Sequence, residues 1–103
     1  MNTSGRYTPK TVNAAVDWLL EDMPLKSKAA VARMSKSELF NLRSTFGKYI
    51  KRQFDLGPEN QELLDSCRFA AKDPLLDPDE ADYVILKALW HKLRETHKLR
   101  IVK

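Results

Sequence analysis

Apolar residues recur every three to four positions from Ser35 to Phe54, and this spacing constrains the fold more than any other feature of the chain. At about 100° per residue, one helix face collects five apolar side chains, namely Leu39, Leu42, Phe46, Ile50 and Phe54. The opposite face collects Lys48, Lys51 and Arg52. The stretch is therefore predicted to form one helix that is both a core element and a basic surface.

Four further segments have the same helical spacing, and no strand pair interrupts them. We expect an all-α protein, a single compact bundle of about five helices, two of them short. The expected helices cover about residues 9–23, 28–34, 36–56, 59–71 and 78–98. The last has an apolar arc too wide for a single neighbour, so we place it at the centre of the bundle. We expect residues 99–103 to form a short separate ending with Leu99 and Ile101 packed down.

Side chains that cap helices stand before four of these segments, namely Thr8, Ser27, Ser35 and Asp77. The last two have a glutamate three residues later, Glu38 and Glu80, at the spacing of a capping box. Gly57 is expected to end the central helix in a left-handed conformation. The helical period also assigns apolar positions to six alanines, namely Ala15, Ala30, Ala70, Ala71, Ala81 and Ala88.

A length of 103 residues is that of one domain. We expect a flexible tail over residues 1–7 and a single helical domain over residues 8–103. The one cysteine, Cys67, cannot form an internal disulfide, and no apolar run approaches the roughly 18 residues of a membrane span. Together with a start unlike a signal peptide, these features predict a cytoplasmic protein that does not bind a membrane.

Charge is distributed along the chain in blocks. Residues 26–52 carry a net charge of +7, residues 58–82 of −6 and residues 83–103 of +5, within a total of +4. Two interpretations stay open. Either neighbouring blocks neutralise each other across helix contacts, or one basic face remains available to a partner.

The sequence contains no pattern of a known catalytic, metal or cofactor site, so the chain is predicted not to be an enzyme and to hold neither metal nor cofactor. His91 and His97 are six residues apart, which turns them away from each other on a helix. Cys67 lies on an apolar stripe, as core cysteines do. The acids between Asp73 and Asp82 lack the glycine and the final glutamate of a calcium loop, so helix capping accounts for them.

Gly47 lies inside the predicted central helix, where glycine costs about 1 kcal/mol relative to alanine. Its presence indicates that another backbone passes close to that position. We prefer tight helix packing to the approach of a ligand as the explanation.

Two interaction hypotheses follow. The first is an unidentified protein partner or a homodimer, anchored by Trp18 and Phe69, which lie off the apolar stripes of their helices. A second packing contact inside the bundle is the alternative for both residues. The second hypothesis is nucleic-acid binding through the basic residues of the central helix, namely Arg43, Lys48, Lys51 and Arg52. Residues 27–50 have the outline of a helix-turn-helix motif but lack its usual turn glycine.

Six short motifs also bear on the fold: KAAVARM at residues 28–34, SELFNL at 37–42, GKYIKRQFDL at 47–56, NQELLDSC at 60–67, DPDEA at 77–81 and ALW at 88–90. With them the chain resembles a family of small uncharacterised bacterial domains, a domain of unknown function. The likeness covers most of the chain beyond the N-terminal tail. It implies an all-helical fold and brings no activity that can be assigned to a residue.

Overall fold

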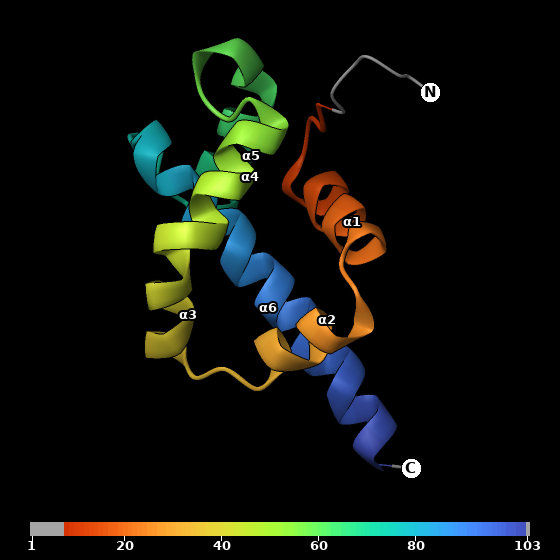
Figure 1. The fold of residues 1–103 in the computed structure, drawn as a ribbon. Coiled ribbons are helices and arrows are strands. Elements are labelled where there is room, and N and C mark those ends of the chain that lie inside the picture. Colours follow the sequence, from red (N-terminus) through yellow and green to blue (C-terminus); the bar gives the residue numbers. More distant parts are fainter. Residues whose placement is uncertain (1–7, 103) are drawn as a thin grey trace.

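The computed structural model describes residues 8–102, which form helices joined by short turns, with no strand in that range (Figure 1). The α-helices are α1 (Val12–Asp22), α2 (Leu25–Ala32), α3 (Lys36–Leu42), α4 (Lys48–Phe54), α5 (Gln61–Ala71) and α6 (Pro78–Val102). A π-helical turn, η1 (Arg43–Gly47), joins α3 to α4, and a 3₁₀ turn, η2 (Pro58–Asn60), precedes α5. Because α3, η1 and α4 form one continuous helix, the described chain has the five helices expected, and the all-α prediction is confirmed.

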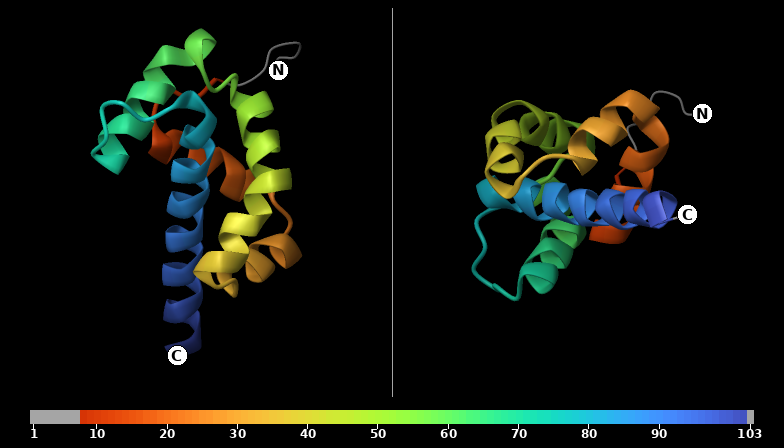
Figure 2. Two further views of the ribbon diagram at one scale, coloured as in Figure 1. Left: turned by 90° about the vertical axis from the view of Figure 1, so that its left-hand side faces the viewer. Right: turned by 90° about the horizontal axis from the view of Figure 1, so that it is seen from below.

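The long helix α6 lies at the centre of the bundle, as its wide apolar arc predicts. In Figure 2 it runs between α5 on one side and α2 and α4 on the other, and α1 crosses it. Every other α-helix packs on it. Its buried side chains include Ala81, Asp82, Ile85, Leu86, Leu89, Trp90 and Leu93. The hydrophobic core therefore surrounds α6, and the other helices are positioned by it.

The π-helical turn η1 changes which apolar residues of the central helix reach the core. Leu39, Ile50 and Phe54 are fully buried, as predicted, but Leu42 and Phe46 are only partly buried. A π turn widens the helix by one residue, so the side chains around it leave the α-helical stripe. Ser44 and Thr45 favour the turn, because their hydroxyls donate to the carbonyls of residues 41 and 42.

Two predicted helix starts are wrong by three residues. Helix α1 begins after Thr11, whose hydroxyl accepts from the N–H of Ala14, and not after Thr8. Helix α2 begins after Pro24 and not after Ser27. Pro24 is the N-cap residue, in an extended conformation, and no side chain caps α2; the carbonyl of Pro24 accepts the first helical hydrogen bond, from the N–H of Lys28 at 3.1 Å.

Of the other predicted helix ends, two caps are present and one is wrong. The capping box of Ser35 and Glu38 is present, and Asp77 accepts from the N–H of Asp79 at the start of α6. The left-handed residue after α4 is Asp55, with φ of 51°, and not Gly57, which has φ of 147°. Aspartate tolerates the left-handed region better than most residues, so the helix ends two residues earlier than the glycine suggested.

The predicted burial of three alanines is also wrong. Ala30 is exposed on α2, and Ala70 and Ala71 are exposed on the last turn of α5. A helical period assumes that a neighbour covers the whole length of a helix. Here α5 ends at Ala71, and its last turn is exposed on the side that carries Ala70 and Ala71.

The structure describes the N-terminal end of the chain from Thr8 and the C-terminal end to Val102. Helix α6 continues to Val102, so the separate ending expected from residue 99 is wrong over residues 99–102. The predicted tail, residues 1–7, lies outside the described residues. Within residues 8–102, no helix is long and apolar enough to cross a lipid bilayer.

Asn60 is a buried polar residue that joins three segments of the fold. Its Nδ2 donates to the carbonyl of Pro9 at 3.0 Å and to that of Phe54 at 2.9 Å, and its Oδ1 accepts from the N–H of Leu63. The side chain thereby connects the start of the described chain, the end of α4 and the start of α5. Pro9, fully buried there, belongs to this junction and not to α1.

Replacing Asn60 with alanine leaves two buried carbonyls without a donor, so the free energy of unfolding should fall by about 2 to 3 kcal/mol. Urea denaturation of purified protein measures the change. Asn13→Ala, at an exposed position of α1, is the control and should shift stability by less than about 0.5 kcal/mol. Equal effects of the two substitutions would contradict the junction.

Candidate functional site

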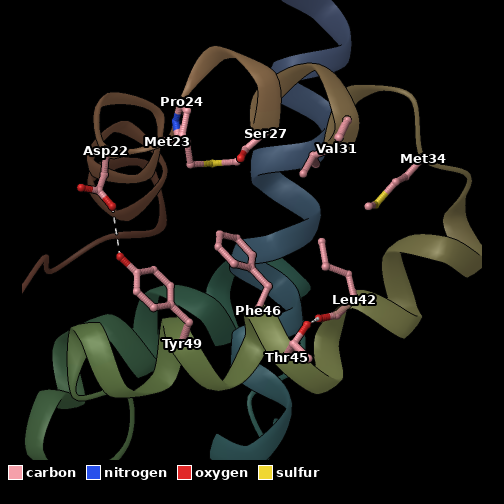
Figure 3. A pocket seen from close by; sticks show the side chains of 11 residues that line it. Asp22, Met23, Pro24, Ser27, Val31, Met34, Leu42, Thr45, Phe46 and Tyr49 are labelled. Atoms are coloured by element: carbon pink, nitrogen blue, oxygen red, sulfur yellow. Dashed lines mark hydrogen bonds between the residues drawn. The ribbon is translucent and has the colours of Figure 1, made fainter.

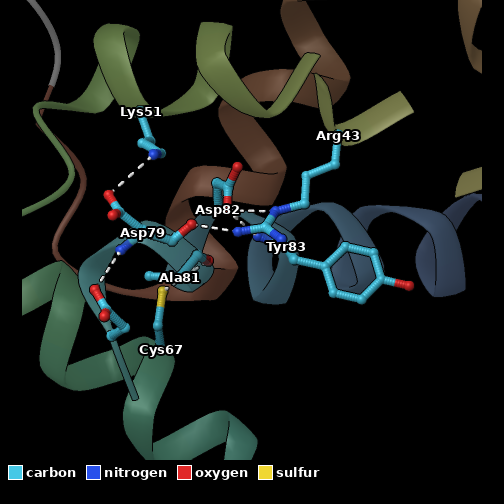
Figure 4. A network of polar contacts seen from close by, with 8 residues as sticks. Arg43, Lys51, Cys67, Asp79, Ala81, Asp82 and Tyr83 are labelled. Atoms are coloured by element: carbon cyan, nitrogen blue, oxygen red, sulfur yellow. Dashed lines mark hydrogen bonds and ion pairs between the residues drawn. The ribbon is translucent and has the colours of Figure 1, made fainter. Parts of the chain in front are cut away.

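Arg43 and Asp82 form a partly buried ion pair that joins η1 to the start of α6 (Figure 4). Arg43 Nε donates to Asp82 Oδ1 at 3.2 Å, and Arg43 Nη2 donates to the carbonyl of Asp79. Asp82 Oδ1 also accepts from the N–H of Tyr83 at 2.8 Å. Asp82 is 2% exposed, and a carboxylate so buried is tolerated only when it is paired and hydrogen-bonded. The pair therefore fixes the central helix on α6.

Gly47 is required by this contact. A Cβ atom at residue 47 would overlap Asp82 Oδ2 and would lie 3.0 Å from Arg43 Cγ. The close neighbour of Gly47 is thus a buried carboxylate and not, as predicted, another backbone. Tight packing remains the reason for the glycine.

The four residues of the nucleic-acid hypothesis do not share one environment. Arg43 is paired with Asp82, and Lys51 Nζ contacts Asp79 Oδ1 at 3.3 Å. Lys48 and Arg52 are exposed on α4. Two of the four cations thus face carboxylates of α6, as the charge blocks allowed. The basic segment 26–52 and the acidic segment 58–82 neutralise each other at these contacts.

A largely apolar groove lies between α2 on one side and η1 and α4 on the other (Figure 3). Its volume is about 530 Å³, in the range of sites that bind small molecules or side chains of a partner. Three exposed residues, Ser27, Ala30 and Thr45, stand on its walls. Its apolar lining includes Met23, Val31, Met34, Leu42 and Phe46. Figure 3 shows Phe46 pointing from η1 toward α2, across the middle of the groove.

Both walls of the groove are attached to α6. Trp90 Nε1, on α6, donates to the carbonyl of Met34 at 3.0 Å, and Val31 is a buried residue of α2. The opposite wall is held by the pair of Arg43 and Asp82. Each wall of the groove thus has its own attachment to α6.

One end of the groove is closed by a hydrogen bond between α4 and α1. Tyr49 Oη donates to Asp22 Oδ2 at 3.1 Å (Figure 3). Partial burial raises the pKa of the Tyr49 hydroxyl, and the hydrogen bond to Asp22 and its charge raise it further. Tyr49 therefore stays protonated and keeps donating at neutral pH.

Cys67 and His91 do not form a reactive pair. Cys67 is fully buried, and its Sγ donates to the carbonyl of Ala81 at 3.6 Å. Burial, with the negative charge of Asp82 as a second cause, raises the pKa of the thiol to about 12. His91 is exposed beside Trp90, and the side chain of His97 lies outside the described residues. Within the part of the chain that the structure describes, no three His, Cys, Asp or Glu side chains are grouped to hold a metal ion.

The two predicted anchor residues lie in different surroundings. Trp18 is partly buried, and its ring meets the ring of Phe54 edge to face with centroids 5.6 Å apart. Phe69 is 87% exposed on α5. Trp18 therefore makes the second packing contact considered for it, whereas Phe69 remains open to a partner.

The sequence does not predict the groove, because the helical period assigns Leu42 and Phe46 to the core stripe. Ser44, Thr45 and Gly47 are poor helix formers close together, and they mark the place where the α-helical period fails. No periodicity argument could show that α2 and η1 would both pack on α6 with a gap between them.

Comparison with known proteins gives a family and no function. The sequence model of a family described as a domain of unknown function (DUF6794) matches residues 8–93. No curated protein and no solved structure matches the chain.

Gly47→Ala should lower the free energy of unfolding by about 1 to 3 kcal/mol, because the new methyl group displaces the buried carboxylate of Asp82. The sign is informative, since alanine in an open helix position would stabilise by about 1 kcal/mol. A double-mutant cycle measured by urea denaturation provides the control. In an Asp82→Ala background the same substitution should lose most of its cost. A stabilised single variant would contradict the contact.

The Cys67 thiol should resist alkylation by iodoacetamide in the folded protein at neutral pH and react on unfolding. Because its folded pKa of about 12 lies above that of an unfolded thiol, the stability it contributes is present below about pH 8.5 and is lost as pH rises toward 12. Between those values the slope is about 1.4 kcal/mol per pH unit. Urea denaturation at several alkaline pH values should show a steeper loss for the wild type than for Cys67→Ala. Parallel profiles would refute the assignment.

Proposed function

This chain belongs to the DUF6794 family, whose description names no activity, and we propose that it is a protein-interaction module that binds an apolar segment of another protein chain in the groove between α2 and α4. The groove carries the proposal. It is an open apolar depression on a small protein, and exposed apolar surface of that kind marks interaction sites.

The lining of the groove suits a peptide segment. Met23 and Met34 stand at its two ends, and methionine side chains adapt to differently shaped apolar partners. Phe46 and Leu42 are partly exposed inside it, so covering them with a partner removes further apolar surface from water. The attachment of both walls to α6 lowers the cost of ordering on binding.

Charge around the groove favours an acidic segment. Of the residues that line the groove only Asp22, at the end closed by Tyr49, is charged, so the charge that favours an acidic partner comes from cations beside the lining. Among the described residues Arg43 and Lys51 are paired with α6, whereas Lys26, Lys28 and Arg33, on and just after α2, form no such pair. A partner whose apolar residues are flanked by aspartate or glutamate would meet complementary charge.

The alternative of nucleic-acid binding has less support. Its four cations include Arg43 and Lys51, which are paired with carboxylates, and binding through the others would rest on Lys48 and Arg52. A phosphate backbone is bound by several cations on one face. The predicted cytoplasmic location and the absence of catalysis remain predictions that fit an interaction module equally well.

Photo-crosslinking in cells that produce the protein tests the proposal. A photoreactive phenylalanine analogue replaces Ser27 or Thr45, both exposed on the groove walls, and in a separate sample it replaces Asn13, exposed on α1. Protein adducts should form at the two groove positions and not at residue 13. Mass spectrometry then identifies the partner, which is purified and titrated against the wild-type protein.

Ala30→Glu provides the decisive variant, because it places a charge in the groove at an exposed position without removing any packed side chain. It should weaken the binding of the purified partner at least about tenfold, whereas Asn13→Glu, with the same added charge, should leave that binding unchanged. Partners that bind all three proteins equally, or adducts only at residue 13, would overturn the proposal.

A further inference from the structure

The corner between α5 and α6 exposes two large apolar side chains. Phe69, on the last turn of α5, is 87% exposed, and Leu75, in the connection to α6, is 89% exposed. We call these two residues the apolar corner. They are the two most exposed of the large apolar side chains in the part of the chain that the structure describes, and both belong to this one corner.

The backbone that carries the apolar corner is well fixed. Lys72 ends α5 in the left-handed conformation, and its N–H donates to the carbonyl of Phe69 at 3.1 Å. The N–H of Leu75 donates to Asp73 Oδ1 at 3.1 Å, and Arg68 Nε donates to the carbonyl of Leu76 at 3.0 Å. The two apolar side chains are thus presented by an ordered turn, which lowers the cost of burying them in a partner.

The apolar corner and the groove lie on opposite sides of the molecule. In the left panel of Figure 2, the end of α5 and the loop after it are at the far left, whereas α2 and α4 are on the right. A chain therefore cannot place its own corner in its own groove. Two copies can do so without either blocking the surface it leaves free.

Charge makes a second copy a suitable occupant. Among the described residues, the α2 wall of the groove carries three cations without an ion pair, Lys26, Lys28 and Arg33, against one acid in the groove lining, Asp22. Exposed acids, Asp65, Asp73 and Asp77, flank the corner, although Arg68 and Lys72 are also there. The corner is thus an apolar surface with a small excess of acid, which matches the excess of cations on α2.

We propose that the groove of one copy receives Phe69 and Leu75 of a second copy, in a head-to-tail contact. The inference rests on the proposed function, because it names the occupant of the same groove. Such a contact uses different surfaces on the two copies, so it continues into chains or closes into a ring. A contact centred on two side chains is smaller than the roughly 1,200 Å² of stable interfaces, which sets the expected dissociation constant between about 1 µM and 1 mM.

Two variants, each blocked on one surface, test the contact. Ala30→Glu blocks the groove, and the double substitution Phe69→Gln with Leu75→Gln blocks the corner. All three positions are exposed, so the variants should fold like the wild type, and circular dichroism checks this. Sedimentation velocity and light scattering then give the mass in solution over a range of concentrations.

The wild type and the control Asn13→Glu should increase in mass with concentration, and each blocked variant alone should remain a monomer. An equimolar mixture of the two blocked variants should form a dimer and nothing larger, because only one intact groove and one intact corner are present per pair. A mixture that stays monomeric, or a blocked variant that associates alone as the wild type does, would overturn the inference.

The crosslinking experiment separates the two levels of the argument. If the mixture stays monomeric while a different purified protein binds the groove and Ala30→Glu releases it, the second copy is the wrong occupant and the interaction module stands. If nothing binds the groove in either experiment, both proposals fail.

Discussion

The ion pair of Asp82 with Arg43 is the contact on which the rest of the arrangement depends. Asp82 is almost fully buried near the start of α6, and its charge is tolerated because Arg43 reaches it from the π-helical turn. The same carboxylate excludes any side chain at residue 47 and adds to the raised pKa of Cys67. One buried polar contact thereby sets the position of the helix formed by α3, η1 and α4 and limits which residues can pack beside it.

The groove follows from two separate attachments to one helix. Trp90 holds the turn after α2 on α6, and Arg43 holds η1 on α6 about two turns away, so the space between the two walls is defined by α6 and not by a direct contact of the walls. The π turn then moves Leu42 and Phe46 out of the core and into that space. The helix that the sequence predicts as a core element therefore supplies one wall of the binding surface that we propose.

Much of the fold could be predicted from the sequence, because burial of Leu39, Ile50 and Phe54 follows from a local period. The groove could not, because it depends on a hydroxyl-supported π turn and on the packing of distant helices. Asn60 was missed for a related reason, since its partners lie up to 51 residues away. The exposure of Ala70 and Ala71 depends on where α5 loses its neighbour. The spacing of apolar residues identifies the faces of a helix, but it does not identify the elements that cover those faces.

The central claim is that the groove is a protein-binding surface and that a second copy occupies it. Nuclear magnetic resonance of the isotopically labelled wild-type protein tests this most directly, with amide chemical shifts recorded as the concentration rises from about 20 µM to about 1 mM. The account predicts shifts that move together at the groove walls, around Ser27, Ala30 and Thr45, and at Phe69 and Leu75. Shifts that stay constant, or that move only around Lys48 on α4, would contradict it.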